Sequence, residues 1–106
     1  MENSGLIKSI IKDVLLARGL KTEKILLFGS RARGDNDRLS DYDILVIINQ
    51  TLSVPEKMEI SSLIRKKSAE KKIDADVIIK SAKETETSAK QFGTVTRDVL
   101  REGVPL

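Results

Sequence analysis

The chain has 106 residues, of which 40% are hydrophobic, and a formal net charge of +3. This length supports one domain with one core, and the mostly aliphatic apolar residues are typical of a compact α/β domain. The sequence contains no histidine and no cysteine, which excludes disulfides, zinc sites of the usual ligands and histidine-activated nucleophiles. Any chemistry must therefore use carboxylates, hydroxyls, Lys or Arg side chains and hard metal ions.

The first half of the chain predicts one long helix followed by two strands. Apolar residues at helical spacing predict a helix over residues 4–20. Short apolar runs predict buried strands over 24–28 and 40–49, because runs of this length between turn signals are typical of strands. Between the strands, a short helix is expected from 30–33 and a polar loop over 34–38.

The second half predicts a helix, a strand and a last helix. The helix over 53–72 begins with the Ser-x-x-Glu spacing of a capping box, and 73–80 predicts the third strand. The face of the last helix is formed by Phe92, Val95, Val99 and Leu100, and Gly103 and Pro105 would end it. This order predicts a single α/β domain over 1–106, with one sheet layer backed by helices.

Two familiar loop motifs fail in the stretch "FGSRARGDNDRLSDYDILVII", residues 28–48. The spacing Gly29-x4-Gly34 is that of a P-loop start, but Asp35 follows where a phosphate-binding lysine is required. An EF-hand loop that began at Asp35 would need a bidentate glutamate where Val46 stands. The sequence therefore predicts neither a P-loop nor an EF-hand.

A third pattern fits, in which Gly29-Ser30 is followed after ten residues by Asp41-x-Asp43. Side chains two apart on a strand share a face, so both carboxylates, ~6.5–7 Å apart, can bind hard cations such as Mg²⁺. The glycine lets the backbone approach an anion, and Ser30 offers a hydroxyl and an amide at a helix start. This pattern predicts adjoining phosphate and metal sites. The alternative is that the aspartates simply form a solvated start of the strand.

The third predicted strand adds Asp74 and Asp76, which also share one face. We predict that Asp76 completes a three-carboxylate site, because it precedes an apolar run as Asp43 does. The alternatives are that Asp74 takes this place or that Asp76 is simply an exposed carboxylate of the strand. Arg33 is a candidate for binding triphosphate oxygens because a guanidinium fits phosphate geometry. The alternative is that this arginine is solvated.

Other features of the sequence carry simpler expectations. Tyr42 is expected to pack in the core on the face opposite the aspartates. The basic run over 65–72 lacks interleaved aromatic residues, so it predicts a solvated helix face rather than a nucleic-acid site. The longest apolar run, 44–48, is too short to span a membrane. Because the amino terminus lacks the apolar core of a signal peptide, we expect a cytoplasmic protein.

The segments "GSRARG…SDYDILV", "DADVII" and "RDVLREGVPL" resemble the signature of the minimal nucleotidyltransferases (MNT) of the DNA polymerase β superfamily. The resemblance spans nearly the whole chain. It implies a mixed sheet with flanking helices, two Mg²⁺ ions, and transfer of a nucleoside monophosphate from a triphosphate such as ATP. Many such short proteins are the antitoxin half of HEPN–MNT toxin–antitoxin pairs, and some add AMP to the toxin.

We therefore expect a Mg²⁺-dependent nucleotidyltransferase whose acceptor is a HEPN-type toxin, a second copy of the chain or a small molecule. The expected catalytic and metal-binding residues are Asp41, Asp43 and Asp76, and the expected nucleotide-binding residues are Gly29, Ser30 and Arg33. In the absence of histidine, Asp76 is also the candidate to accept the acceptor's proton. The alternative is a non-catalytic antitoxin or nucleotide-binding module that neutralises its partner by docking.

Overall fold

The computed structural model of the chain describes residues 3–29, 41–89 and 103–106. The helices are α1 (Ser4–Ala17), α3 (Val54–Glu70) and α4 (Ala82–Ala89), and the strands are β1 (Thr22–Phe28), β2 (Tyr42–Ile48), β3 (Ala75–Ser81) and β4 (Val104–Pro105). The predicted short helix over 30–33, the predicted loop over 34–38 and the predicted helix around 92–100 lie outside the described residues.

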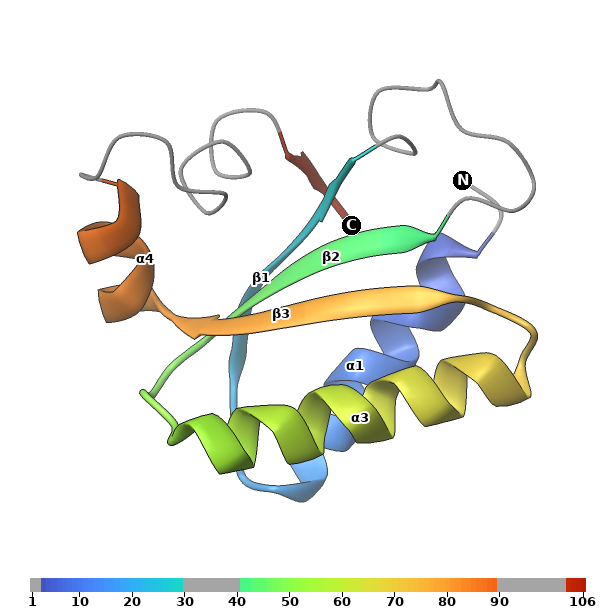
Figure 1. The fold of residues 1–106 in the computed structure, drawn as a ribbon, viewed down its shortest axis with the longest axis horizontal. Helices are drawn as coiled ribbons and strands as arrows, with labels where there is room; N and C mark the ends of the chain where they lie inside the picture. The colour runs from blue at the N-terminus through green and yellow to red at the C-terminus, as the bar shows by residue number, and fades with distance from the viewer. Residues whose placement is uncertain (1–2, 30–40, 90–102) are drawn as a thin grey trace.

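The four strands form one mixed sheet in the order β3-β2-β1-β4. Strand β1 is antiparallel to both β2 and β4, whereas β2 and β3 are parallel. A parallel pair needs a crossover connection, and α3 provides it. Figure 1 shows α1 and α3 together on one face of the sheet and α4 continuing from the end of β3. The predicted mixed sheet with flanking helices is confirmed.

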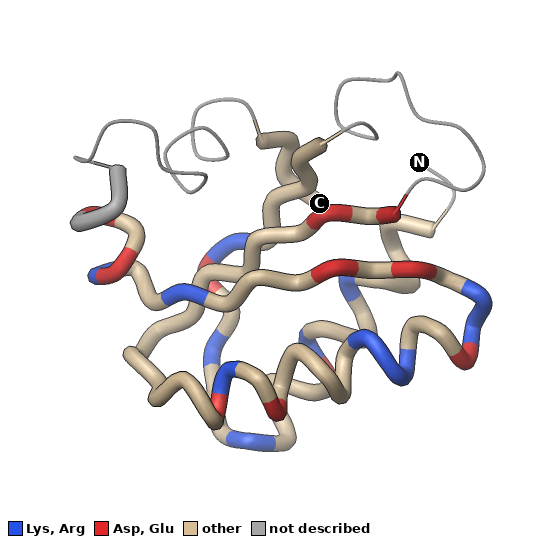
Figure 2. Tube along the Cα trace, viewed as in Figure 1, with Lys and Arg blue, Asp and Glu red and all other residues tan. Residues whose placement is uncertain are grey.

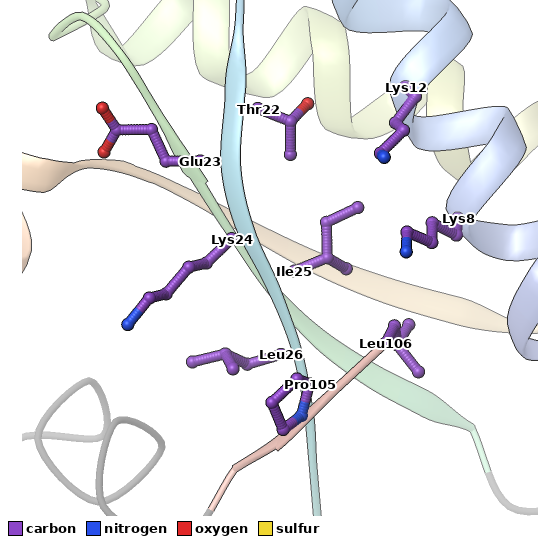
Figure 3. A pocket seen from close by; sticks show the side chains of 9 residues that line it. All are labelled: Lys8, Lys12, Thr22, Glu23, Lys24, Ile25, Leu26, Pro105 and Leu106. Atoms are coloured by element: carbon purple, nitrogen blue, oxygen red, sulfur yellow. The ribbon is translucent and has the colours of Figure 1, made fainter.

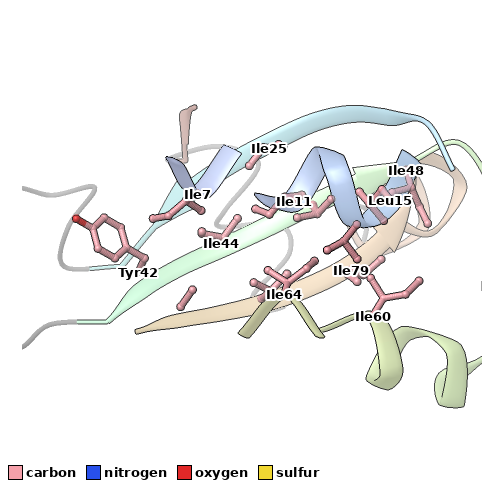
Figure 4. Packing of buried hydrophobic residues seen from close by; sticks show 14 of the residues in the cluster. Ile7, Ile11, Leu15, Ile25, Tyr42, Ile44, Ile48, Ile60, Ile64 and Ile79 are labelled. Atoms are coloured by element: carbon pink, nitrogen blue, oxygen red, sulfur yellow. The ribbon is translucent and has the colours of Figure 1, made fainter. Parts of the chain in front are cut away.

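The main core lies between this sheet and the helices α1 and α3 (Figure 4). Ile7 and Ile11 of α1 and Ile64 of α3 are fully buried against alternate residues of the strands. Full burial of such a side chain contributes about 1.5–3 kcal/mol to the free energy of unfolding. The opposite face of the sheet buries a second group, which consists of Leu26, Leu45 and Ile47. The aspartates of β2 and β3 belong to this second face, because side chains alternate along a strand.

The start of α3 confirms the predicted capping box. The Ser53 hydroxyl oxygen accepts a hydrogen bond from the backbone N–H of Glu56 at 3.3 Å, and it donates to the Glu56 carboxylate at 3.0 Å. Pro55 stands in the first turn, where a missing N–H is tolerated. Ile60 and Ile64 are buried and Leu63 is half-buried, so the helix presents the predicted face to the core.

Helix α4 and strand β4 were not predicted from the sequence. The residues that start α4 form a second capping box: the Glu84 N–H donates to the Ser81 hydroxyl at 3.0 Å, and the Ser81 N–H donates to the Glu84 carboxylate at 2.9 Å. The same carboxylate pairs with the Lys57 ammonium of α3 at 2.5 Å. Strand β4 has only two residues, which is too short to show an alternating pattern. Among the described residues, none of the helices has the length and apolar content needed to cross a membrane.

The environment of Glu84 changes the pKa of its carboxyl group. Burial has the largest single influence and raises this pKa. The hydrogen bonds from Lys57 and Ser81 and the positive charge of Lys57 outweigh it, because they stabilise the ionised carboxylate. The pKa of Glu84 is therefore lowered from its usual 4.5, and the ionised pair joins α4 to α3.

Candidate active site

Two pairs of aspartates lie side by side at one end of the sheet, as Figure 2 shows. Asp41 directly precedes β2 and Asp43 is its second residue; Asp74 and Asp76 take the same positions at β3. The parallel register pairs Asp43 with Asp76, and the N–H of Tyr42 donates to the carbonyl of Asp74 at 2.8 Å. Neighbouring strands lie about 4.8 Å apart. The fold thus brings together two acidic segments that are more than thirty residues apart in the sequence.

Tyr42 fixes the face to which these aspartates belong. Its ring is buried in the main core on the side of α1, as predicted, and its hydroxyl accepts a hydrogen bond from the Asn3 side chain at 3.4 Å. Asp43, one residue later, belongs to the opposite face because side chains alternate. It is half-buried, whereas Asp41, Asp74 and Asp76 are exposed. Three of the four carboxylates are therefore open to solvent and to ligands from outside.

Gly29 lies against the carboxylate of Asp43. It follows the last residue of β1, Phe28, which pairs with Asp43 in the antiparallel register. Its φ of +76° belongs to the left-handed region that favours glycine, and a Cβ added at this position would lie 2.3 Å from the Asp43 Oδ2 atom. The sequence predicted a glycine that approaches a phosphate. The structure places its backbone beside the half-buried carboxylate.

A hollow of about 180 Å³ adjoins three of the aspartates. It is lined by Asp41, Asp74 and Asp76 together with Ile73, Ala75, Ala69 and Arg65. Arg65 comes from α3, and its place in the basic run over 65–72 predicted only a solvated helix face. The turn between α3 and β3 is short, which brings the last turns of the helix next to the start of the strand. That short connection is the signal that could have placed Arg65 beside the aspartates.

The donor atoms at this edge suit a hard divalent cation. Carboxylate oxygens are the protein ligands that Mg²⁺ prefers, and it is usually held by one or two carboxylates plus water and phosphate oxygens. Within the ranges 3–29, 41–89 and 103–106, no three acidic side chains are grouped closely enough to surround one ion. The predicted phosphate contacts Ser30 and Arg33 lie outside the described residues.

Comparison with known families identifies the class of this domain. The family described as "Nucleotidyltransferase domain" matches residues 8–103. The chain therefore belongs to the nucleotidyltransferase domain family, which confirms the family predicted from the sequence. One relative is a protein of Methanocaldococcus jannaschii that has the provisional name protein adenylyltransferase MJ0141. It is 38% identical over 60 residues, which is 57% of this chain and 61% of that protein.

Solved structures agree with the fold. A mutant of the toxin–antitoxin complex MntA–HpeT contains a chain that matches 95% of this one over 69% of its own length, with 22% identity and a TM-score of 0.61. A toxin–antitoxin structure with AMP-PNP matches 88% of this chain over 78% of its own, with 27% identity and a TM-score of 0.51. The first likeness confirms the fold class, a small mixed sheet flanked by helices.

Proposed function

We propose that this chain is a Mg²⁺-dependent nucleotidyltransferase that moves AMP from ATP onto a partner protein, as the antitoxin of a toxin–antitoxin pair. The observation that carries the proposal is the register of β2 and β3, which pairs Asp43 with Asp76 and sets Asp41 beside them. Membership of the nucleotidyltransferase family supports the reaction class. The provisional name of the Methanocaldococcus relative and the AMP-PNP-bound toxin–antitoxin structure support ATP as substrate and a toxin as partner.

Each aspartate has a separate part in this reaction. Asp43 lies beside Asp76 in the register of β2 and β3, and Asp41 directly precedes β2; in the proposed reaction these carboxylates would hold the metal ions that bind the triphosphate. In the proposed in-line displacement, the acceptor hydroxyl bonds to the α-phosphorus of ATP as the bond to pyrophosphate breaks, and two Mg²⁺ ions held by these carboxylates would stabilise the entering and leaving oxygens. Asp76 also accepts the proton of the attacking hydroxyl, since the chain has no histidine to do so. Asp74 is the alternative for this third position.

The nucleotide-binding part of the proposal rests on the residues that follow β1. Gly29 directly follows β1 and lies beside the carboxylate of Asp43. We assign the triphosphate contacts to Gly29, Ser30 and Arg33. An amide and a hydroxyl at a helix start bind phosphate well, and a guanidinium adds a bidentate contact.

A transfer assay tests the activity. The chain is incubated with Mg²⁺, with ATP labelled in its α-phosphate, and with the protein encoded beside its gene; the labelled products are then separated by mass. We expect label on the partner protein, and none with the Asp43→Asn variant or with EDTA. Asp13→Asn, an exposed residue of α1, serves as the matched control and should transfer normally. If the partner is neutralised but never labelled, the chain acts by docking and the transferase proposal is wrong.

A further inference from the structure

The hollow beside the aspartates lies on the β3 side of the candidate active site. Strand β2 has β1 on one side and β3 on the other. Gly29, which directly follows β1, lies against Asp43 of β2, whereas most residues that line the hollow come from the start of β3 and the end of α3. The proposed nucleotide site and the hollow are therefore on opposite sides of β2.

The proposed reaction requires the acceptor to approach from the side of this hollow. In an in-line displacement, the attacking and leaving oxygens lie on opposite sides of the phosphorus. With the triphosphate bound beside Gly29, the leaving pyrophosphate lies toward β1, so the attacking hydroxyl arrives from the side of β3. Asp76, the residue proposed to accept the proton of that hydroxyl, is one of those that line the hollow. The hollow is thus the place for the groups that surround the accepting hydroxyl.

A larger hollow, of about 270 Å³, lies between α1 and β1 and does not meet this requirement (Figure 3). None of the four aspartates is among the residues that line it. It also lies on the β1 side of the sheet, toward which the pyrophosphate leaves. The smaller hollow is therefore the better candidate for the acceptor.

Arg65 carries the single positive charge among the described residues that line the smaller hollow. The same lining contains the carboxylates of Asp41, Asp74 and Asp76. Arg65 takes part in neither of the two ion pairs found among the described residues. Its planar guanidinium offers paired N–H donors that match a carboxylate in a bidentate contact. The hollow therefore combines acceptors for a hydroxyl proton with one donor group for an anion.

The surroundings of Arg65 add to its positive charge. Five basic residues stand against one acidic residue, Glu70, over 65–72. All five basic side chains are exposed. Figure 2 shows this stretch at the end of α3 and in the turn into β3, at the same end of the sheet as the aspartates. An acidic protein segment that approaches the hollow would be attracted by this stretch, because complementary charges steer association.

The simpler roles of a basic helix residue do not explain the position of Arg65. A basic side chain stabilises a helix through the helix dipole when it lies in the last turn, and in α3 the residue in that position is Lys67. A basic residue that only keeps the helix solvated has no need to line the hollow. Lys66 and Lys67 are equally exposed and do not line it. Arg65 is thus the member of the basic run whose position suits a ligand in the hollow.

We infer that Arg65 selects the acceptor, because its guanidinium pairs with a carboxylate within about one helical turn of the accepting hydroxyl on the partner protein. The inference rests on the proposed function and names the kind of hydroxyl to which AMP is moved. The aspartates alone would repel such a carboxylate, and the pair with Arg65 offsets this repulsion. The hydroxyl is then held next to Asp76. Arg65 acts on acceptor binding and has no part in nucleotide binding.

Steady-state transfer assays separate acceptor binding from the chemical step. The probe is the protein encoded beside the gene of this chain, with labelled ATP at saturating concentration. In Arg65→Glu, the KM for this acceptor should rise at least about tenfold, while kcat and the affinity for ATP change by less than about threefold. Arg65→Lys should give an intermediate KM, because it keeps the charge and loses the bidentate contact. Lys66→Glu is the matched control, and its KM should stay within about twofold of the original value.

An exchange of charges identifies the carboxylate. Mass spectrometry of the labelled partner locates the modified hydroxyl, and each acidic residue within about four positions of it is changed to lysine in turn. One of these partner variants should lose transfer by the original chain and regain at least about tenfold with Arg65→Glu. An arginine that only balances the charge of the aspartates would not show this compensation.

The outcomes distinguish failure of the inference from failure of the transferase proposal. The inference alone is wrong if the partner is labelled but no exchange restores transfer, or if Arg65→Glu and Lys66→Glu raise the KM equally. It is also wrong if Arg65→Glu weakens ATP binding as much as acceptor binding, since Arg65 would then belong to the nucleotide site. If the original chain labels no partner, the transferase proposal fails and the inference fails with it. Circular dichroism checks the folding of each variant, and Arg65→Lys supplies the comparison if Arg65→Glu does not fold.

Discussion

Substitution of Gly29 by alanine should damage nucleotide binding far more than it damages stability. The added Cβ would lie 2.3 Å from the Asp43 Oδ2 atom and 3.2 Å from its Cγ atom. Contacts under 3.0 Å are essentially never seen for a real Cβ, so the carboxylate oxygen must move by about 0.7 Å or more. The atoms that the added Cβ would meet all belong to the Asp43 side chain and none to the backbone. The contact itself therefore affects the position of the carboxylate more than the fold.

Gly19 provides the matched control for this substitution. Its φ of +72° is close to the +76° of Gly29, but a Cβ added at Gly19 meets nothing within 4 Å. Either alanine variant should lose about 1–2 kcal/mol of unfolding free energy, because both adopt a left-handed conformation. In a domain of this size that loss lowers the Tm by about 4–8 °C per kcal/mol.

Only the Gly29→Ala variant should lose function. A displacement approaching 1 Å in a catalytic group can reduce activity by about a hundredfold, and we expect a loss of about tenfold to a hundredfold in Mg²⁺-dependent ATP affinity. Calorimetric titration and thermal unfolding of the two variants measure the two effects separately. Equal ATP affinity in Gly29→Ala and Gly19→Ala would refute the assignment of the Asp43 carboxylate to the metal site.

Three other results are expected. Asp76→Asn should reduce transfer of label to the acceptor by at least about a hundredfold, whereas Asp74→Asn should reduce it by less than about tenfold. A larger loss in Asp74→Asn than in Asp76→Asn would assign the third carboxylate to Asp74. The ion pair of Glu84 contributes to the free energy of unfolding above pH 4.5, and this contribution is lost as the pH falls through the lowered pKa of the carboxyl group in the folded state. In urea unfolding between pH 6 and 3, the Glu84→Gln variant should therefore lose less unfolding free energy than the original chain. Identical slopes in the two proteins would contradict the role of the ion pair. Ile64→Ala should lower the free energy of urea unfolding by about 2–5 kcal/mol because it leaves a cavity. Met58 is 65% exposed, so Met58→Ala should change this free energy by less than about 0.5 kcal/mol. Similar losses for both variants would contradict the described core.

The sequence predicted the elements that bury continuous apolar faces. The helix over 4–20 and the strand over 40–49 were recognisable because their apolar residues follow the periods of a helix and of a buried strand. The capping box at Ser53 also marked the start of α3. A second Ser-x-x-Glu spacing at Ser81 was equally present, but α4 has little apolar surface, so periodicity gave no support to it. A capping signal without an apolar face is therefore not enough to predict a helix.

The candidate site shows the same division between local and long-range information. The spacing of Asp41 and Asp43 is local, so their common face follows from strand geometry alone. The pairing of Asp43 with Asp76 depends on strand order and register, which one sequence does not specify. The contact of Gly29 with Asp43 depends on the register of β1 and β2.

We propose above all that the aspartates at the end of β2 and β3 bind Mg²⁺ and ATP. Isothermal titration calorimetry of ATP, with Mg²⁺ and with EDTA, tests it most directly on the original chain and on the Asp41→Asn, Asp43→Asn double variant. We predict Mg²⁺-dependent binding by the original chain and at least about a hundredfold weaker binding by the double variant, with its circular dichroism spectrum unchanged. Equal ATP affinity in the two proteins would contradict the account.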